Sequence, residues 1–354
     1  MRILSIYLMR TILTSTLLVL GVLLALASLF EFIGELDNTM GDYGIPQALL
    51  YSVFRLPQMA FEMLPMATLI GALLGLGGLA NSSQLIVMRA SGLSVNKLGS
   101  MVAMTGVVLM ISTAFIGEYV GPPLDYFARN MRNEARFQQG ESNFGQAAWV
   151  KDGPTILHLE RVNSEFEFGD IYLFRFNEDN SLRSIARAEN SGIDDSDKWI
   201  LENFNETQFQ DNDVQIVTSS LAVESFDVSG DILGITLVKP VSLSVQGLLS
   251  YIRYLKKNSL SSREYETELW SRISTTITVV IMPVLALAFV LGSLRAAGSG
   301  RRLIIGALIG LGYYLSSELI VNSGQIYNLN PSFVTWLPSL ALLVITLFVL
   351  DRVR

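Results

Sequence analysis

Six long apolar runs constrain this chain more than any other feature of its sequence. Five contain no charged residue, and the run at 303–321 is interrupted only by Glu318. Each approaches or exceeds the roughly 20 residues that a helix needs to cross a bilayer. The chain is also 50% hydrophobic and only 16% charged, which is unusual for a soluble protein. The sequence therefore predicts a membrane protein with six transmembrane helices. The other runs are 11–30, 63–88, 98–117, 273–294 and 333–350.

The positions of the charges predict the orientation better than the net charge of −7 does. Basic residues gather beside the termini and in the segments after the second and fourth runs, whereas the segment after the first run is acidic. Short cytoplasmic loops are enriched in Lys and Arg. We therefore expect both termini in the cytoplasm and the polar region between the third and fourth runs on the other side. The basic residues are Arg2, Arg10, Arg89, Lys97, Arg295, Arg301, Arg302, Arg352 and Arg354, and the acidic ones are Glu31, Glu35, Asp37 and Asp42.

The polar region reads as a β domain. Short segments of alternating polar and apolar residues are separated by Gly, Asn, Asp and Pro, which is typical of an antiparallel sandwich or open roll. We predict three parts: residues 1–135, a β domain at 136–240, and residues 241–354, which begin with an amphipathic helix at 244–258 on the membrane surface. The predicted strands are 147–151, 155–162, 170–176, 182–187, 198–202, 214–218 and 221–226.

Two further segments suggest packing and docking. Gly71 and Gly75 have the small-xxx-small spacing that lets helices approach closely in lipid. Residues 81–94 predict a short cytoplasmic helix with Leu85 and Met88 on one apolar face and Gly92 as its stop. This segment is either a plain loop helix or a docking helix for a partner, because an apolar face on a loop needs to be covered.

Arg129, Arg132 and Arg136 share one face of a helix after the third run. The segment is either a solvated charge run or a site for anionic headgroups, because arginine binds phosphate through two parallel hydrogen bonds.

No catalytic residues, metal-ligand cluster or nucleotide-binding loop can be nominated, and the chain has no cysteine. His158 lies in a predicted strand without a partner for a metal and is interpreted as structural. Glu62, Glu118 and Glu318 lie near the outer ends of their helices and not at the midplane, where an ion relay is expected. Any energy for transport is therefore expected to come from a partner protein.

The chain resembles the lipopolysaccharide-export permeases of Gram-negative bacteria over nearly its whole length. The resemblance is carried by FEMLPMATLIGALLGLG at 61–77, LIVMRASG at 85–92, GEYVG at 117–121 with ARN at 128–130, LERV at 159–162, and GLLSYIRYL at 247–255 leading to WSR at 270–272.

This resemblance implies a permease subunit of the bacterial inner membrane that binds no cofactor or nucleic acid. It would pair with the homologous permease LptF on a dimer of the ATPase LptB, which uses ATP and Mg²⁺, and with the single-span protein LptC. The complex would extract lipopolysaccharide from the outer leaflet and pass it to LptA in a periplasmic bridge of β-jellyrolls, one of which the inserted domain resembles.

The resemblance also implies three groups of site residues. Lipid A phosphates would meet residues at the outer ends of the helices, the first and fifth helices would line a substrate cavity, and the helix at 81–94 would dock on the ATPase. Related sequences place a Glu where this chain has Gln84, and lysines where it has Glu31 and Asp37. Phosphate recognition is therefore expected to shift to arginines, or to a divalent cation that bridges acid and phosphate. The headgroup residues are Arg55, Arg129, Arg132, Arg136, Glu31 and Asp37; the cavity residues are Leu26, Phe30, Met63, Ala67, Leu311 and Tyr314; and the coupling residues are Gln84, Leu85, Met88, Arg89, Ala90 and Gly92.

Two other classes of function remain open at this point. A membrane scaffold or sensor would use the outer domain only to recruit partners, and an ion-coupled transporter would use Glu62, Glu118 or Glu318. An integral-membrane enzyme is the weakest reading, because the sequence offers no nucleophile with a base.

Overall fold

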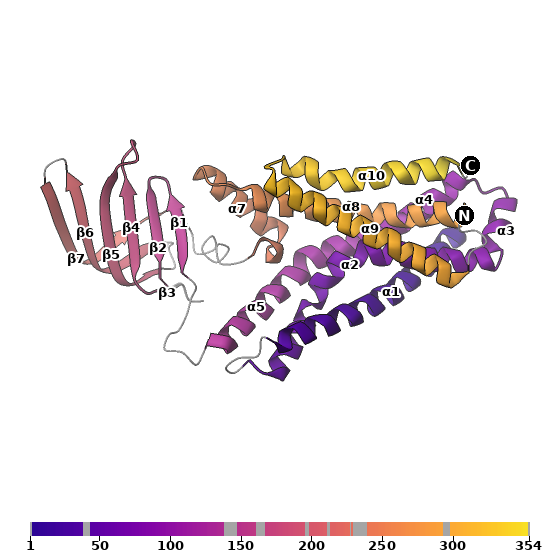
Figure 1. Ribbon diagram of the computed structural model, residues 1–354, viewed down its shortest axis with the longest axis horizontal. Coiled ribbons are helices and arrows are strands. Elements are labelled where there is room, and N and C mark those ends of the chain that lie inside the picture. Colours follow the sequence, from indigo (N-terminus) through magenta and orange to yellow (C-terminus); the bar gives the residue numbers. More distant parts are fainter. Residues whose placement is uncertain are drawn as a thin grey trace. The chain divides into compact units, whose positions relative to one another are not determined.

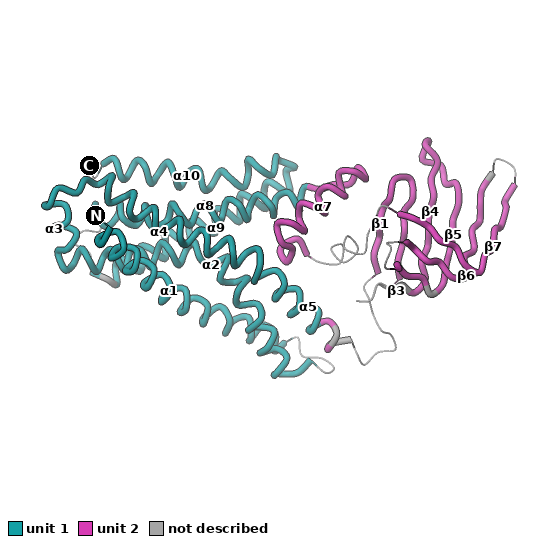
Figure 2. Tube along the Cα trace, turned by 180° about the vertical axis from the view of Figure 1, so that it is seen from behind, with its two compact units in different colours: residues 1–132, 263–354 teal, residues 133–262 magenta. Residues whose placement is uncertain are grey.

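The computed structural model describes residues 2–37, 43–137, 147–160, 167–194, 198–210, 213–226, 228, 239–292 and 298–352. The chain divides into two compact units (Figure 2). One contains residues 1–132 and 263–354, and the other contains residues 133–262.

The first unit is built from long apolar helices (Figure 1). Six helices among the described residues are long and apolar enough to cross a membrane, which confirms the predicted number of spans. The run at 63–88 does not form one span, because it contains the end of α2 and the separate short helix α3. Five of the six are α1, α2, α8, α9 and α10, and the third along the chain is formed by α4, a π-helix and most of α5 in succession. The bounds of the helical elements are α1 (Arg2–Leu36), α2 (Ile45–Asn81), α3 (Gln84–Ala90), α4 (Val95–Phe115), the π-helix (Ile116–Val120), α5 (Gly121–Phe137), α8 (Arg263–Leu291), α9 (Ser299–Ile326) and α10 (Pro331–Arg352).

The two ends of this unit differ in what they carry. Figure 1 shows both chain ends and α3 at one end, and the C-terminal end of α1 at the other, beside α5. Three spanning helices separate the N-terminus from the inserted residues, and three more follow them. An odd number of crossings puts the junctions with the second unit at the end away from the termini.

Helices α1 and α2 approach each other closely through glycine, as the small-xxx-small spacing predicts. A Cβ added at Gly71 would lie 2.4 Å from the Cα of Thr16, and one added at Gly75 would lie 3.0 Å from Ser15 Oγ. Only a residue without a side chain lets the two backbones come this near, and such contacts hold helices together where lipid provides no hydrophobic drive.

Hydroxyl groups join α8 to α10 in the interior of the same unit. Ser274 and Ser339 are 2.7 Å apart, Thr278 and Ser339 are 2.8 Å apart, and Tyr313 of α9 reaches Ser339 at 3.1 Å. Because these groups bond to each other, they contribute to helix association in place of unsatisfied polar atoms in hydrocarbon.

The second unit contains an antiparallel sheet. Its strands pair in the order β1-β2-β4-β5-β6-β7, and β3 pairs with β5. The antiparallel β domain is confirmed, and the described strands form one sheet, which is compatible with the open roll and not with the two-layer sandwich of the two predicted alternatives. The predicted strands at 214–218 and 221–226 are a single strand. The strands are β1 (Ala148–Asp152), β2 (Thr155–Leu159), β3 (Glu167–Phe168), β4 (Ile171–Phe176), β5 (Leu182–Ile193), β6 (Trp199–Gln210) and β7 (Asp213–Glu224).

A short 3-10 turn (Pro240–Ser242) and helix α7 (Val245–Lys257) also belong to the second unit, whereas we group this segment with the C-terminal spans on its sequence. The reason is a set of hydrogen bonds to the β1–β2 hairpin. The Tyr254 hydroxyl donates to the Lys151 carbonyl at 2.9 Å and accepts from the Lys151 N–H at 3.1 Å. The Gly153 N–H donates to Asn258 Oδ1 at 2.9 Å. The sequence gives no sign of these contacts, because they join residues about one hundred positions apart.

Candidate functional site

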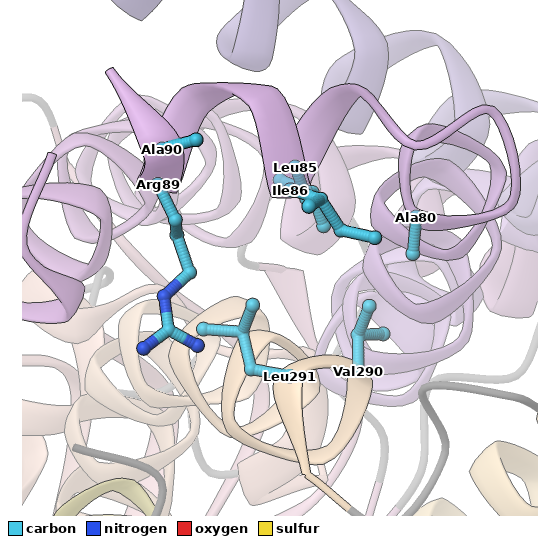
Figure 3. Close-up of a pocket in the computed structure, with 7 residues that line it drawn as sticks. All are labelled: Ala80, Leu85, Ile86, Arg89, Ala90, Val290 and Leu291. Carbon is cyan, nitrogen blue, oxygen red and sulfur yellow. The ribbon is translucent and has the colours of Figure 1, made fainter. Parts of the chain in front are cut away.

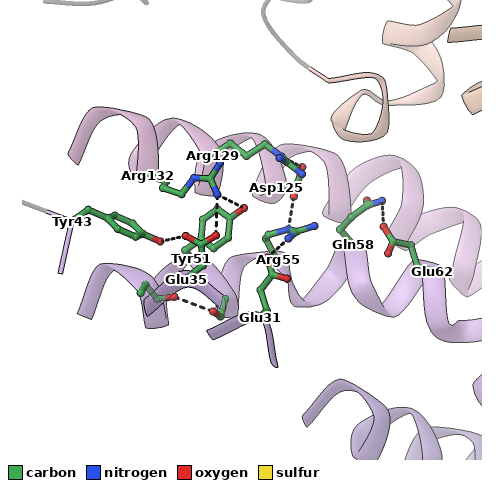
Figure 4. Close-up of polar contacts among 12 residues, drawn as sticks. Glu31, Glu35, Tyr43, Tyr51, Arg55, Gln58, Glu62, Asp125, Arg129 and Arg132 are labelled. Atoms are coloured by element: carbon green, nitrogen blue, oxygen red, sulfur yellow. Dashed lines mark hydrogen bonds and ion pairs between the residues drawn. The ribbon is translucent and has the colours of Figure 1, made fainter. Parts of the chain in front are cut away.

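Three arginines and three carboxylates form a network of two sets of ion pairs where the C-terminal end of α1 meets α2 and α5 (Figure 4). Arg55 of one set and Arg132 of the other both contact Tyr51. Arg55 of α2 lies between two carboxylates. Its Nε is 3.0 Å from Asp125 of α5, and its Nη1 pairs with Glu31 of α1. The second oxygen of Asp125 is 2.8 Å from Arg129 Nε, one turn further along α5. The network therefore joins three helices through one buried carboxylate.

A second branch of the network holds Glu35 of α1. Arg132 Nη1 donates to its carboxylate at 2.9 Å, and the Tyr43 hydroxyl donates to it at 3.0 Å. The Arg132 guanidinium also lies over the Tyr51 ring, 5.0 Å from its centroid. Burial and the hydrogen bond to Glu35 raise the pKa of the Tyr43 hydroxyl well above its ordinary value, so Tyr43 stays a donor.

Burial explains why these charges are paired. The side chain of Asp125 is fully buried, and that of Glu35 is 7% exposed. An isolated buried carboxylate is very unfavourable, so a carboxylate in this position needs a cationic partner. With three acids and three arginines the cluster carries no net formal charge, so the arginines are not the unpaired basic face that their spacing suggests.

The network collects four of the six residues predicted to meet headgroups: Arg55, Arg129, Arg132 and Glu31. Asp37 lies exposed at the end of α1. Arg136 belongs to the second unit. Sequence reasoning missed Asp125 as a network member, although its i,i+4 spacing to Arg129 was a usable signal. Headgroup binding itself stays a prediction.

Helix α3 turns its larger apolar residues inward. Leu85 is 2% and Met88 is 9% exposed, and both pack in a core cluster with residues of α1, α2, α4, α8 and α10. The exposed apolar residues of α3 are Ile86 and Val87, at 44% and 66% exposure. The Arg89 and Ala90 positions are exposed as well. The surface of α3 that a partner can reach is therefore formed by these four residues and not by Leu85 and Met88.

Both ends of α3 are fixed by specific contacts. Gln84 accepts a hydrogen bond from the Tyr7 hydroxyl of α1 at 2.8 Å. At the other end Gly92 has a φ of +91°, the left-handed conformation that glycine adopts at little cost. The N–H groups of Gly92 and Leu93 donate to the carbonyls of Arg89 and Met88, which is a Schellman motif. Gly92 is thus the predicted stop.

A cavity of about 360 Å³ lies between α3 and the end of α8. Figure 3 shows Arg89 extending from α3 toward Leu291, while Leu85 and Ile86 lie nearer to Ala80 and Val290. Among the described residues, the side chains that line this cavity are apolar except that of Arg89.

Residues 6–352 match the protein family described as lipopolysaccharide export system permease LptF/LptG. The chain belongs to this LptF/LptG family.

Within the family, similarity to LptG extends over nearly the whole chain. The chain is 32% identical to LptG of Escherichia coli K12 over 350 residues, which cover 98% of this chain and 97% of that protein. It is 30% identical to LptG of Haemophilus influenzae over 352 residues, or 98% of both chains. LptF of Escherichia coli K12 is 30% identical over 193 residues, only 52% of this chain and 51% of LptF. The whole-length matches are therefore to LptG.

The residues predicted to line a cavity in this family member fall into two groups. Four lie on the open surfaces of α1 and α9: Leu26, Phe30, Leu311 and Tyr314 are 50%, 72%, 46% and 50% exposed. Ala67 is fully buried and Met63 packs beside it, in a cluster whose buried residues come from α1, α2, α4 and α8. Helices α1 and α9 thus present apolar faces that other parts of the described chain leave uncovered, which a partner, a substrate or lipid has to cover.

His158 packs among aromatic rings of the sheet. Its ring centroid is 4.3 Å from that of Trp149 and 6.1 Å from that of Tyr172. In the part of the chain that the structure describes, no group of three or more His, Asp or Glu side chains is placed to hold a metal. The structural interpretation of His158 agrees with this packing.

Proposed function

We propose that the chain is the LptG-type permease subunit of an ATP-driven exporter of lipopolysaccharide. The observation that carries the proposal is the match to export permeases over 98% of the chain, which includes all of the spanning helices and the inserted β unit. The exporter would extract lipopolysaccharide from the outer leaflet of the inner membrane and pass it toward the outer membrane.

The energy would enter through α3 from a separate ATPase, LptB. The exposed residues Ile86, Val87, Arg89 and Ala90 would face the ATPase, while Leu85 and Met88 pass any movement to the chain's own core. Arg89 would take part in place of the acidic residue that is Gln84 here, because the Gln84 side chain is engaged with Tyr7. The second permease would be LptF, which the chain resembles over half its length.

The inserted β unit would lie in the periplasm and serve as a jellyroll of the bridge that LptC and LptA continue. The end of the helical unit that carries α3 and both termini would then face the cytoplasm. The basic segments beside the termini support this orientation, since positive charge is retained in short cytoplasmic loops.

Lipid A phosphates would bind at the ion-pair network. A phosphate carries more acceptor oxygens than a carboxylate and pairs with arginine in the same two-point geometry. We propose that phosphates displace Glu31 and Glu35 from Arg55 and Arg132, while Asp125 keeps Arg55 and Arg129 in position.

The proposal is tested by transport in a reconstituted system. The chain is purified with LptF, LptB and LptC, placed in proteoliposomes with lipopolysaccharide, and offered soluble LptA as an acceptor. We expect ATP-dependent transfer that continues when an ionophore removes the proton gradient. Transfer that needs the gradient and no ATP would indicate an ion-coupled transporter, and a complex without any transfer would indicate a scaffold.

The headgroup site is tested separately by photocrosslinking to lipopolysaccharide. Arg132→Gln is expected to reduce crosslinking beside the network, and Arg10→Gln, an exposed arginine at the opposite end of α1, serves as the matched control. Equal crosslinking in both variants would remove the network from substrate binding without affecting the assignment as a permease.

A further inference from the structure

Arg302 is fully buried in the first turns of α9, which is unusual for an arginine. Its Nη1 donates to the carbonyl oxygen of Gly77 of α2 at 2.6 Å, across 225 positions in the sequence. The sequence predicts only a basic loop residue at this position, so the contact emerges from the tertiary structure. A buried guanidinium with this contact links α9 to α2 directly.

Gly77 leaves the space that the Arg302 side chain fills. A Cβ added at Gly77 would lie 2.6 Å from both Cδ and Nη1 of Arg302, closer than real Cβ atoms approach other atoms. The neighbouring Gly78 differs, because a Cβ there would meet nothing within 4 Å. A side chain at Gly77 would therefore displace the Arg302 side chain, whereas one at Gly78 would meet no neighbour.

The contact between Arg302 and Gly77 lies near the C-terminal end of α2, and α3 follows α2 directly in the chain. Helix α2 ends at Asn81, four residues after Gly77, and α3 begins at Gln84. Carbonyl groups near the C-terminal end of a helix carry partial negative charge, which favours a cation there. Leu85 and Met88 of α3 share one core cluster with Leu76 and Leu79 of α2. A displacement of α3 must therefore move the end of α2 that Arg302 holds.

Helices α2 and α9 stay in close contact beyond Arg302. A Cβ added at Gly306 would lie 2.7 Å from Leu73 Cδ1, and one added at Gly310 would lie 2.9 Å from Met66 Cγ. These glycines follow Arg302 at intervals of four residues, so one face of α9 is fitted to α2. The opposite side of α9 is open, with Leu308 64% and Leu319 67% exposed. The arrangement allows α9 to follow α2 as a unit.

We propose that Arg302 is a positioning residue that transmits movement of α3 to α9, and so couples ATP hydrolysis in the partner to movement of lipopolysaccharide. This inference rests on the proposed function. Arginine suits the role because its guanidinium remains charged and is costly to leave buried without an acceptor. Its contact with Gly77 joins the two helices directly.

The test measures lipopolysaccharide transfer per ATP hydrolysed in the reconstituted exporter. We expect Arg302→Met and Gly77→Ala to assemble and hydrolyse ATP, while transfer per ATP falls about tenfold, a typical size for coupling between sites. Arg302→Lys should restore part of the ratio, because it keeps the charge with fewer donors. Gly78→Ala is the matched control and should match the wild type. A complex that is merely unstable loses hydrolysis and transfer together and leaves the ratio unchanged.

A distance measurement gives an independent readout, because the chain has no native cysteine to interfere with labelling. Spin labels on Ser91→Cys, an exposed position directly after α3, and on Leu319→Cys of α9 report their separation by pulsed electron resonance in the assembled exporter. We expect ATP-analogue binding to change this separation in the otherwise wild-type chain and to change it much less with Arg302→Met or Gly77→Ala.

The outcomes distinguish the two proposals. Wild-type ratios and distance changes in both the Gly77→Ala and Arg302→Met variants would overturn the role of Arg302. If Arg302→Met failed to assemble, Gly77→Ala, which keeps the guanidinium, would decide by the same two measurements. If the wild-type exporter itself transferred no lipopolysaccharide, the proposed function would fall instead.

Discussion

Arg132 of α5 donates to Glu35 of α1 at 2.9 Å, and the Glu35 side chain is almost completely buried. These residues are 97 positions apart. Much of the length of α1 exposes apolar side chains, including Leu17, Leu18 and Phe30. The C-terminal end of α1 is held to α2 through the ion pair of Glu31 with Arg55 and to α5 through that of Glu35 with Arg132.

Removing the charge of Glu35 should weaken this attachment. Glu35→Gln leaves the Arg132 guanidinium without its carboxylate, and breaking one side of a buried pair costs on the order of 3 kcal/mol. We expect a lower melting temperature for the purified chain in detergent. Asp37→Asn, at an exposed position two residues away, should leave it unchanged. A Glu35→Gln chain as stable as the wild type would show that the pair does not hold α1.

Gly71→Ala should destabilise the helical unit, because the new Cβ would meet the backbone of Thr16 and α1 would have to move away. Gly78→Ala adds the same methyl group in open space and improves helix propensity by roughly 0.5–1 kcal/mol. Thermal unfolding in detergent should therefore rank Gly78→Ala at or above the wild type and Gly71→Ala below it. The reverse order would contradict the close approach of α1 and α2.

Glu206 of β6 should make the stability of the sheet depend on pH in the acidic range. Burial by itself raises the pKa of its carboxyl, but hydrogen bonds from Ser184 and Gln208 and the Arg175 guanidinium outweigh it and lower the pKa. The ionised form is thus favoured in the fold. Its contribution is complete above the unfolded-state pKa of about 4.3 and is lost as pH falls through the lower folded-state value.

Thermal unfolding followed by tryptophan fluorescence checks this dependence. The wild type should exceed Glu206→Gln in stability at neutral pH, and the difference should shrink below about pH 4. A difference that stayed constant with pH would mean that the Glu206 charge contributes nothing.

The Tyr254 hydroxyl should ionise at a higher pH than an ordinary tyrosine. Burial raises the pKa of its hydroxyl to about 12; the backbone hydrogen bond at Lys151 opposes this shift, and Tyr251 and Asp152 add to it. The neutral phenol is therefore favoured in the fold, where it bonds to the N–H and the carbonyl of Lys151. This stabilisation is complete below the ordinary tyrosine pKa of about 10 and is lost as pH rises through the folded-state value. The phenolate absorbance of the wild type minus that of Tyr254→Phe should therefore appear near pH 12. Its appearance near pH 10 would place Tyr254 in solvent.

Several elements follow from local sequence alone. The apolar runs predict the spans because only a helix satisfies its own backbone in hydrocarbon. Gly92 predicts the end of α3, and the Gly71–Gly75 spacing predicts a close helix contact. Alternating residues predict an antiparallel domain, although the two strands predicted at 214–218 and 221–226 are the single strand β7, in which Ser219 pairs with Phe204.

Function was accessible at the level of the family, because its motifs are local strings of residues. The ion-pair partners of individual charged residues could not be predicted from the sequence. From the sequence, Arg129 and Arg132 form a basic helix face whose acidic partners are not evident. In the structure Arg132 pairs with Glu35 on another helix, and Arg129 pairs with Asp125 one turn earlier on the same helix.

The sequence by itself determined that six helices are long and apolar enough to cross a membrane and where a β domain is inserted, because hydrophobicity and period are properties of consecutive residues. Only the tertiary structure decided that Leu85 and Met88 face inward, that α7 joins the sheet, and that Arg302 reaches Gly77. Each depends on which helix or strand becomes a neighbour across the fold, and the energy of such a contact is set by burial and geometry that no local pattern contains.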